Sequence, residues 1–73
     1  MKLKGLKKVM TAVDCQNAWV SEFNHDDSEP LTECYKRYKH WIVVSIGTEI
    51  LCGQSIMNIV VAEPLYSIGN ENR

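Results

Sequence analysis

The spacing of hydrophobic positions changes near Asn17, from a helical period to an alternating one. Before that point, apolar residues recur three or four positions apart and so share one helical face: Leu3, Leu6, Met10 and Val13. From Asn17 to Phe23, apolar and polar positions alternate instead, as they do along a half-buried strand. The pattern predicts a helix over Leu3–Ala12, a connection over Asp14–Asn17 and a strand over Asn17–Phe23.

A hairpin with a long acidic tip is predicted next. Residues 24–30 are almost all turn-forming types, and Leu31–Tyr35 returns to an extended pattern. Lys36–His40 then forms a polar connector.

Two apolar strands are predicted to close the sheet. Trp41–Ile46 is rich in β-branched residues and ends at Gly47, and Ile56–Ala62 is a second apolar run that stops before Pro64. Between them, Ile50–Cys52 either continues the first strand beyond a bulge at Gly47 or forms a short piece of its own.

This order of elements predicts one α+β domain over residues 1–66, followed by a loose polar tail over residues 67–73. Short connections favour an antiparallel meander of about four strands, with the N-terminal helix packed across one face. The expected core consists of Leu6, Met10, Val13, Val20, Phe23, Val44, Ile46, Ile59 and Val61.

The composition is that of a small globular domain, since 45% of the 73 residues are hydrophobic and 23% are charged. The formal net charge of -1 argues against a protein that coats nucleic acid or anionic membrane through its overall field. The least charged stretch, Trp41–Ala62, is interrupted by Glu49 and by polar residues. It is therefore predicted to be a core segment and not a membrane span.

The cysteines and histidines indicate neither a metal site nor catalysis. Cys15, Cys34 and Cys52 are odd in number and far apart, and no apolar leader precedes them, so we expect reduced thiols in a cytoplasmic protein. Together with His25 and His40 they could in principle ligate zinc, but no pair has the usual close spacing. Because no nucleophile elbow or phosphate-binding loop is present either, we expect no cofactor and no enzymatic activity.

Charge is distributed in blocks, and the second block is entirely acidic: Glu22, Asp26, Asp27, Glu29 and Glu33. It lacks the register and the central glycine of a calcium loop. A patch of this kind resembles nucleic-acid phosphate to a basic partner and can steer association electrostatically. The alternative is that the acids only keep a hairpin tip solvated. The five acids are the candidate partner-binding residues.

A second candidate is the tract that interleaves bases with aromatic rings: Lys36, Arg37, Tyr38, Lys39 and Trp41. Cations for phosphate and flat rings for stacking are what single-stranded nucleic acid requires. The competing interpretation is that the rings pack inward while the bases solvate a connector.

The chain also resembles a group of small proteins of unknown function that are common in phages and prophages of Firmicutes. The resemblance is carried by the opening Leu3–Val13 with its Asp14, by the acidic hairpin, and by the runs Trp41–Ile46 and Ile59–Val61. It departs from that group at residues 33–36, where a glycine-containing second strand is usual. The resemblance implies a virally encoded accessory protein acting in the host cytoplasm by blocking a defence machine, as anti-CRISPR proteins do, and it assigns no site residues.

Three functions are therefore expected from the sequence. The first is a noncatalytic phage inhibitor whose acidic hairpin occupies the basic, nucleic-acid-binding surface of a larger host protein, such as a CRISPR effector nuclease. The second is a small nucleic-acid-binding module that uses the basic-aromatic tract. The third is a self-associating structural protein, in which an open sheet edge pairs across a twofold axis to form a homodimer.

Overall fold

The computed structural model describes residues 1–64, and the tail expected over residues 67–73 lies outside the described part. The described chain forms three short helices and four strands: α1 Leu3–Lys8, α2 Ala12–Gln16, β1 Ala18–Glu22, β2 Ser28–Pro30, α3 Leu31–Tyr38, β3 Ile42–Leu51 and β4 Gln54–Ala62. The α+β class is confirmed, with helices at the N-terminus and a sheet of four strands.

The sheet is mixed, with strand order β2-β1-β4-β3, and is not the meander that the short connections predicted. β1 pairs with β2 and β3 pairs with β4, both antiparallel, but β1 and β4 run parallel to one another. Val20 lies opposite Ile59 and Glu22 opposite Val61 across this parallel pair. Parallel neighbours need a long crossover, which here consists of β2, α3 and β3. The parallel pairing therefore brings β1 and β4, which are about 40 residues apart in the sequence, together at the centre of the sheet.

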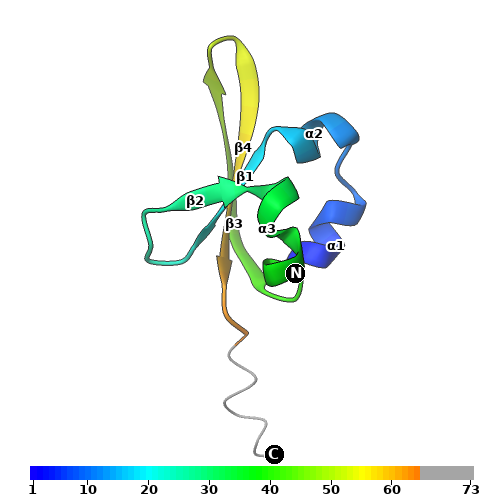
Figure 1. Cartoon of the computed structure of the whole chain (residues 1–73), viewed down its shortest axis with the longest axis vertical. Helices are drawn as coiled ribbons and strands as arrows, with labels where there is room; N and C mark the ends of the chain where they lie inside the picture. Colours follow the sequence, from blue (N-terminus) through cyan, green and yellow to red (C-terminus); the bar gives the residue numbers. More distant parts are fainter. Residues whose placement is uncertain (65–73) are drawn as a thin grey trace, which may run out of the picture.

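All three helices lie on one side of the sheet, and the β3–β4 hairpin extends past them (Figure 1). Ala18 and Val20 of β1 and Ile59 and Val61 of β4 are buried against the helices. The helices contribute the rest of the core: Leu3, Leu6, Leu31, Cys34 and Tyr38. The alternation predicted for β1 is correct, because its even positions 18 and 20 are buried while Trp19 is partly exposed.

The N-terminal helix is shorter than predicted, and a second helix replaces the expected connection. α1 ends at Lys8, and Thr11 then starts α2 by accepting a hydrogen bond from the Asp14 backbone N–H at 3.0 Å. The Asp14 carboxylate accepts in turn from the Thr11 N–H at 3.4 Å. This reciprocal capping box satisfies two backbone donors at the helix start. Asp14 is thus a capping residue of α2 and not part of a connection.

The largest correction concerns Leu31–Tyr35 and Lys36–His40, which were predicted to be a strand and a connector. The strand prediction is wrong and the connector prediction holds only for residues 39–40, because residues 31–38 form α3. The reason is visible in the burial, since the residues that face the core are three or four positions apart: Leu31, Cys34 and Tyr38. Glu33 in the first turn and Lys36 and Arg37 in the last turn also complement the helix dipole.

β3 is one continuous strand, so the open question about Ile50–Cys52 is settled for residues 50 and 51. The bulge is at Val44 and not at Gly47, since the pairing with β4 shifts register between Val43 and Ser45. The hairpin closes through Cys52 and Gly53, whose φ values are 52° and 79°. Two successive residues with positive φ match the type I′ turn that the twist of a two-residue hairpin favours.

Four of the expected core residues lie at the surface. Val13, Phe23, Val44 and Ile46 are 64%, 54%, 48% and 47% exposed. Phe23 faces away from the helices at the end of β1, and Val44 and Ile46 belong to the protruding hairpin. The hairpin extends beyond the helices, which leaves these two residues about half exposed. The remaining predictions are correct: Leu6, Val20, Ile59 and Val61 are buried and Met10 packs against them.

Candidate partner-binding surface

Three of the five predicted acids line one small hollow beside the β1–β2 loop. Glu22 ends β1, Asp27 lies in the loop and Glu29 is in β2, and together with His25 and Tyr38 they surround a space of about 150 Å³. Asp26 is exposed in the same loop. Glu33 is exposed in the first turn of α3 and does not line this hollow. The structure therefore brings four of the predicted acids to one end of β1 and β2.

Two of these acids are engaged within the protein. Tyr38 donates a hydrogen bond of 2.5 Å from its hydroxyl to Glu22 Oε2, and His25 Nε2 lies 3.8 Å from Glu22 Oε1. Arg37 donates to the carboxylate of Glu29 and forms an ion pair with it. The hydrogen bond to Glu22, and then burial, raises the pKa of the Tyr38 hydroxyl. Asp26 and Asp27 form no ion pair or hydrogen bond with any of residues 1–64, so their charges remain available.

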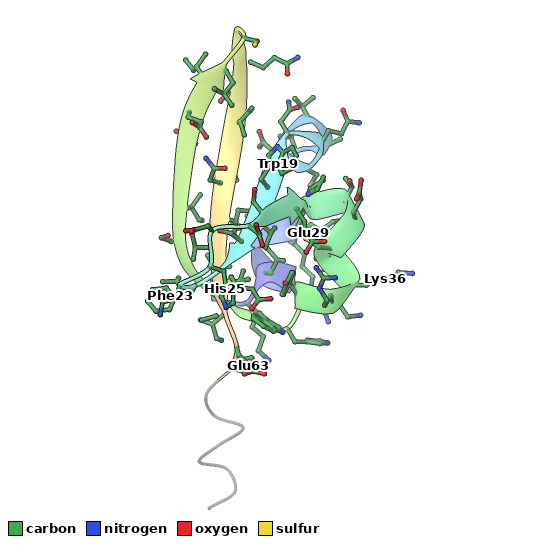
Figure 2. The ribbon with its side chains drawn as sticks, turned by 60° about the vertical axis from the view of Figure 1, so that its left-hand side comes forward. Trp19, Phe23, His25, Glu29, Lys36 and Glu63 are labelled. Carbon is green, nitrogen blue, oxygen red and sulfur yellow. The ribbon has the colours of Figure 1, made fainter. Side chains whose placement is uncertain are left out.

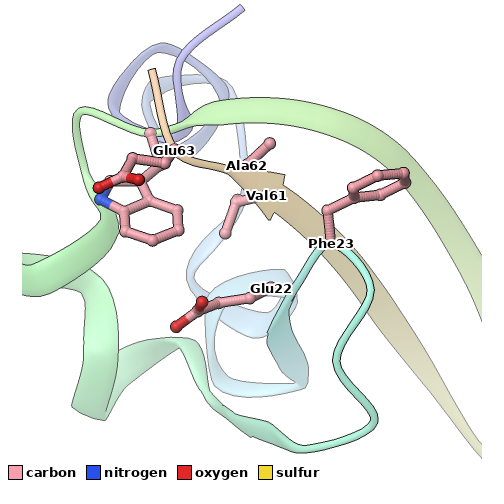
Figure 3. A pocket seen from close by; sticks show the side chains of 6 residues that line it. Glu22, Phe23, Val61, Ala62 and Glu63 are labelled. Atoms are coloured by element: carbon pink, nitrogen blue, oxygen red, sulfur yellow. The ribbon is translucent and has the colours of Figure 1, made fainter. Parts of the chain in front are cut away.

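A second hollow, of about 280 Å³, shares Glu22 with the first and lies where β1 and β4 leave the sheet. Its lining combines apolar groups with two carboxylates: Phe23, Trp41, Val61, Ala62, Glu22 and Glu63. Figure 3 shows the carboxylates of Glu22 and Glu63 on the same side of the end of β4, with Phe23 on the other side. The volume is close to the lower limit of the roughly 300–1,000 Å³ of small-molecule sites, and a single side chain fits within it.

The two hollows share Glu22, and we call the carboxylates that line them, together with that of Asp26 in the adjoining loop, the acidic surface: Glu22, Asp26, Asp27, Glu29 and Glu63. Its aromatic rim comes from Phe23 and Trp41. A lysine or arginine side chain is complementary to such a site, because its alkyl stem packs on apolar groups while its charge meets carboxylates and ring faces. The arrangement can therefore bind a cationic side chain.

The residues of the basic-aromatic tract have mostly structural contacts. Tyr38 is 5% exposed, and the Arg37 guanidinium lies over its ring at 4.7 Å. The Trp41 ring meets Tyr38 edge to face at a centroid distance of 4.7 Å. Tyr38 therefore cannot stack on a base without leaving the core. Lys36 is exposed and projects from the opposite side of the molecule to Phe23 (Figure 2), while Lys39 is half-buried.

The cysteines and histidines do not gather into a ligand set. Among residues 1–64, no three His, Cys, Asp or Glu side chains lie where they could hold one metal ion. Cys34 is buried, Cys15 is half-buried and Cys52 is exposed at the hairpin turn, and all three are free thiols. Burial, and then the charge of Glu29, raises the pKa of the Cys34 thiol. Its Sγ contacts the Glu29 carbonyl oxygen at 3.9 Å, as expected for a packed core thiol.

A third hollow, also of about 280 Å³, lies on the sheet face that the helices leave open. It is lined by Trp19, Ser28, Glu49, Leu51, Ile56 and Asn58, and Glu49 accepts a hydrogen bond of 2.7 Å from Asn58 Nδ2 within it. Its one carboxylate is thus already engaged within the sheet. With one carboxylate against the five of the acidic surface, this hollow offers less to a cationic ligand.

Sequence reasoning missed Glu63 and the apolar part of the site. The signal that was available is the position of Glu63, the first charge after the apolar run of β4 and directly before Pro64. The parallel pairing that places Glu22 opposite Val61 leaves no local pattern in the sequence, so the proximity of residues 22 and 63 could not be predicted.

No helix within residues 1–64 is both long and apolar enough to cross a bilayer. The sequence matches no protein-family model, and neither the curated proteins nor the solved structures yield a match.

Proposed function

We propose that this protein is a noncatalytic interaction protein that binds a basic, nucleic-acid-binding surface of a larger protein through its acidic surface. The observation that supports this proposal most is the hollow in which Glu22 and Glu63 flank an apolar floor beside the exposed acids of the β1–β2 loop. Apolar contact and opposite charge are thereby offered together to one cationic side chain. Interface anchors of this type are commonly arginine, since it stacks and pairs at once.

The loop and the hollow have different roles in this proposal. Asp26 and Asp27 are exposed, so their charges act mainly on the rate of encounter and are weakened by salt. Glu22 is only 36% exposed at its side chain, and one of its oxygens already accepts from Tyr38. A carboxylate has about four acceptor positions, so Glu22 can still receive an incoming cation. The hollow therefore determines how long the complex lasts.

The class of partner follows from the charge and from the resemblance to phage-encoded proteins. A protein surface that binds nucleic acid presents arginine and lysine at close spacing. A host defence protein such as a CRISPR effector nuclease is a partner of this kind, and a phage-encoded inhibitor in the host cytoplasm would displace its nucleic acid. Self-association is a second candidate function, supported by the open edge of β3, and is argued in the next subsection.

The experiment is an affinity measurement on a purified CRISPR effector nuclease without its guide RNA, with displacement of guide RNA as a second readout. We expect the variant Asp26→Lys/Asp27→Lys to bind about tenfold more weakly or worse, mainly through slower association. Glu22→Gln/Glu63→Gln should dissociate faster. The matched control is Glu33→Gln/Glu49→Gln, which removes two charges outside the two hollows of the acidic surface. Equal binding by the wild type and all three double variants would refute the electrostatic mechanism.

A further inference from the structure

The outer edge of β3 is open over most of its length. β3 is the last strand of the sheet, and only its first residues are covered, by the N-terminal segment. There the Val43 N–H donates to the Met1 carbonyl at 2.7 Å, and the Leu3 N–H donates to the Trp41 carbonyl at 3.0 Å. From Val44 onward, no strand within residues 1–64 pairs with this edge.

The backbone groups that point outward can be assigned from the ladder of β4. The Val61 carbonyl accepts a hydrogen bond from the Phe23 N–H, and the Met57 N–H donates to the Asn17 carbonyl. The backbone groups of the odd positions 57–61 therefore point toward β1. The backbone groups of the even positions of β4 therefore point toward β3. They exchange hydrogen bonds with the odd positions of β3 from Ser45 to Leu51. The N–H and C=O groups of Ile46, Thr48 and Ile50 therefore point away from the sheet.

The open segment is symmetric about one residue. The bulge at Val44 bounds it on one side and the turn at Cys52–Gly53 bounds it on the other, so the regular part is Ser45–Leu51. Thr48 is at its midpoint. Ile46 and Ile50, whose backbone groups also point away from the sheet, lie two positions before it and two positions after it. This segment carries one charge, Glu49, and none of the lysines or prolines that usually protect an edge strand.

We propose that β3 pairs with β3 of a second copy of this chain, antiparallel, about a twofold axis at Thr48. Ile46 then lies opposite Ile50 of the second copy, Thr48 lies opposite its own equivalent, and about six backbone hydrogen bonds form. Ile46 and Ile50 are 47% and 76% exposed in the single chain. The pairing covers both and joins the two sheets into one.

The charge of Glu49 and the bulge select this register. With the axis at Thr48, Glu49 faces Gly47 of the second copy and no like charges are opposed. With the axis at Glu49, two carboxylates lie directly opposite one another, which is destabilising. With the axis at Gly47, Ile50 falls opposite the bulge at Val44 and loses its partner. Of the three axis positions, Thr48 is thus the one that pairs the outward-pointing backbone groups of Ile46, Thr48 and Ile50 without opposing like charges.

The interface is small, so we expect a dimer that dissociates on dilution. Seven residues of strand span about 24 Å, and pairing along one edge buries less than the roughly 1,200 Å² of a standard interface. The dimer does not depend on the function proposed above, because the acidic surface lies at the ends of β1 and β4 and not on the β3 edge.

The test combines sedimentation equilibrium over a concentration series with a cross-link, both on the full chain. The wild type should pass from monomer to dimer as concentration rises, and Ile50→Lys should remain a monomer. Val9→Lys is the matched control, because Val9 is 76% exposed, as Ile50 is, but lies at the end of α1 and not on the β3 edge. A wild type that is monomeric at every concentration, or a dimer that Ile50→Lys leaves intact, would overturn the proposal.

The cross-link tests the axis itself. In a hydrogen-bonded antiparallel pair the Cα atoms are about 5.5 Å apart, which is within reach of a disulfide. In a Cys52→Asn background, Thr48→Cys should therefore form a covalent dimer with oxidised glutathione, while Glu49→Cys should form much less. Equal cross-linking of both variants would contradict an axis at Thr48.

Discussion

Tyr38 and Glu22 join the end of α3 to the end of β1 through a hydrogen bond of 2.5 Å from the tyrosine hydroxyl to Glu22 Oε2. The same contact connects the core to the acidic surface, because the Tyr38 ring is buried while Glu22 lines both hollows. The orientation of Glu22 therefore depends on how α3 packs against the sheet.

Replacing Tyr38 with phenylalanine should cost about 1 kcal/mol of unfolding free energy. The variant keeps the buried ring but loses a hydrogen bond to a carboxylate, and partial exposure lets water replace some of it. For a domain of this size the melting temperature should fall by about 4–8 °C. Tyr35→Phe is the control, since no residue in 1–64 hydrogen-bonds the Tyr35 hydroxyl. Equal melting temperatures for the two variants would contradict a stabilising role for the hydroxyl.

The contribution of Tyr38 should also depend on pH in a defined direction. The hydrogen bond to Glu22, and then burial, raises the pKa of Tyr38 above its ordinary value of 10.0. Because the folded pKa exceeds the unfolded one, this stabilisation is complete below the unfolded pKa and is lost as pH rises through the folded pKa. Urea unfolding at about pH 8 and about pH 11 should show the difference between wild type and Tyr38→Phe shrinking at the higher pH. A difference that grows would contradict the assignment.

Much of the sheet follows from local patterns, and α3 shows why the rest does not. β1 and β4 were recognisable because their apolar residues either alternate or run together. In α3, the turn-forming run before Leu31 suggested a returning hairpin strand, and the helical spacing of Leu31, Cys34 and Tyr38 appears only once Cys34 is counted as a core residue. The exposed residues of the hairpin were assigned to the core because their sequence does not reveal that the helices end short of them.

The candidate site was predictable in its charge and not in its shape. The acidic block identified Asp26, Asp27, Glu22 and Glu29, which the structure places around one loop. The apolar hollow with Glu63 exists because β1 and β4 are parallel neighbours, and that pairing joins segments about 40 residues apart. Non-local pairing of this kind cannot be read from a local pattern.

Changing Cys52 to asparagine should stabilise the hairpin. Cys52 has φ of 52°, a conformation that costs an ordinary L-residue about 1 kcal/mol and that asparagine tolerates better. Asn–Gly is also the favoured pair for a type I′ turn. We expect a gain of about 0.5 kcal/mol in unfolding free energy, measured by urea titration. Cys52→Val is the opposite control and should destabilise the protein; a stabilising valine would contradict the turn geometry.

The three thiols should differ in reactivity. Cys52 is exposed, whereas Cys34 is buried and has a raised pKa, so little thiolate forms at Cys34. Alkylation by iodoacetamide followed by mass spectrometry should label Cys52 first and Cys34 only when urea unfolds the chain. Labelling of Cys34 at the rate of Cys52 in the native protein would show that the α3 packing is wrong.

The α2 cap offers a local test of the fold. Thr11→Ala removes the side chain that accepts from the Asp14 N–H and should cost about 1 kcal/mol. The control is Thr32→Ala, an exposed position within α3, which should change stability by less than about 0.5 kcal/mol. Thermal unfolding by circular dichroism compares them, and equal losses would contradict the capping box.

The most direct test of the proposed function is titration of the isotope-labelled protein with a hexa-arginine peptide, followed by nuclear magnetic resonance. The account predicts salt-dependent shifts at the Trp41 indole and at residues 22–27, which weaken in Glu22→Gln/Glu63→Gln and persist in Glu33→Gln/Glu49→Gln. Shifts that are absent, or that are the same in both double variants, would contradict the claim that the acidic surface recognises cationic side chains.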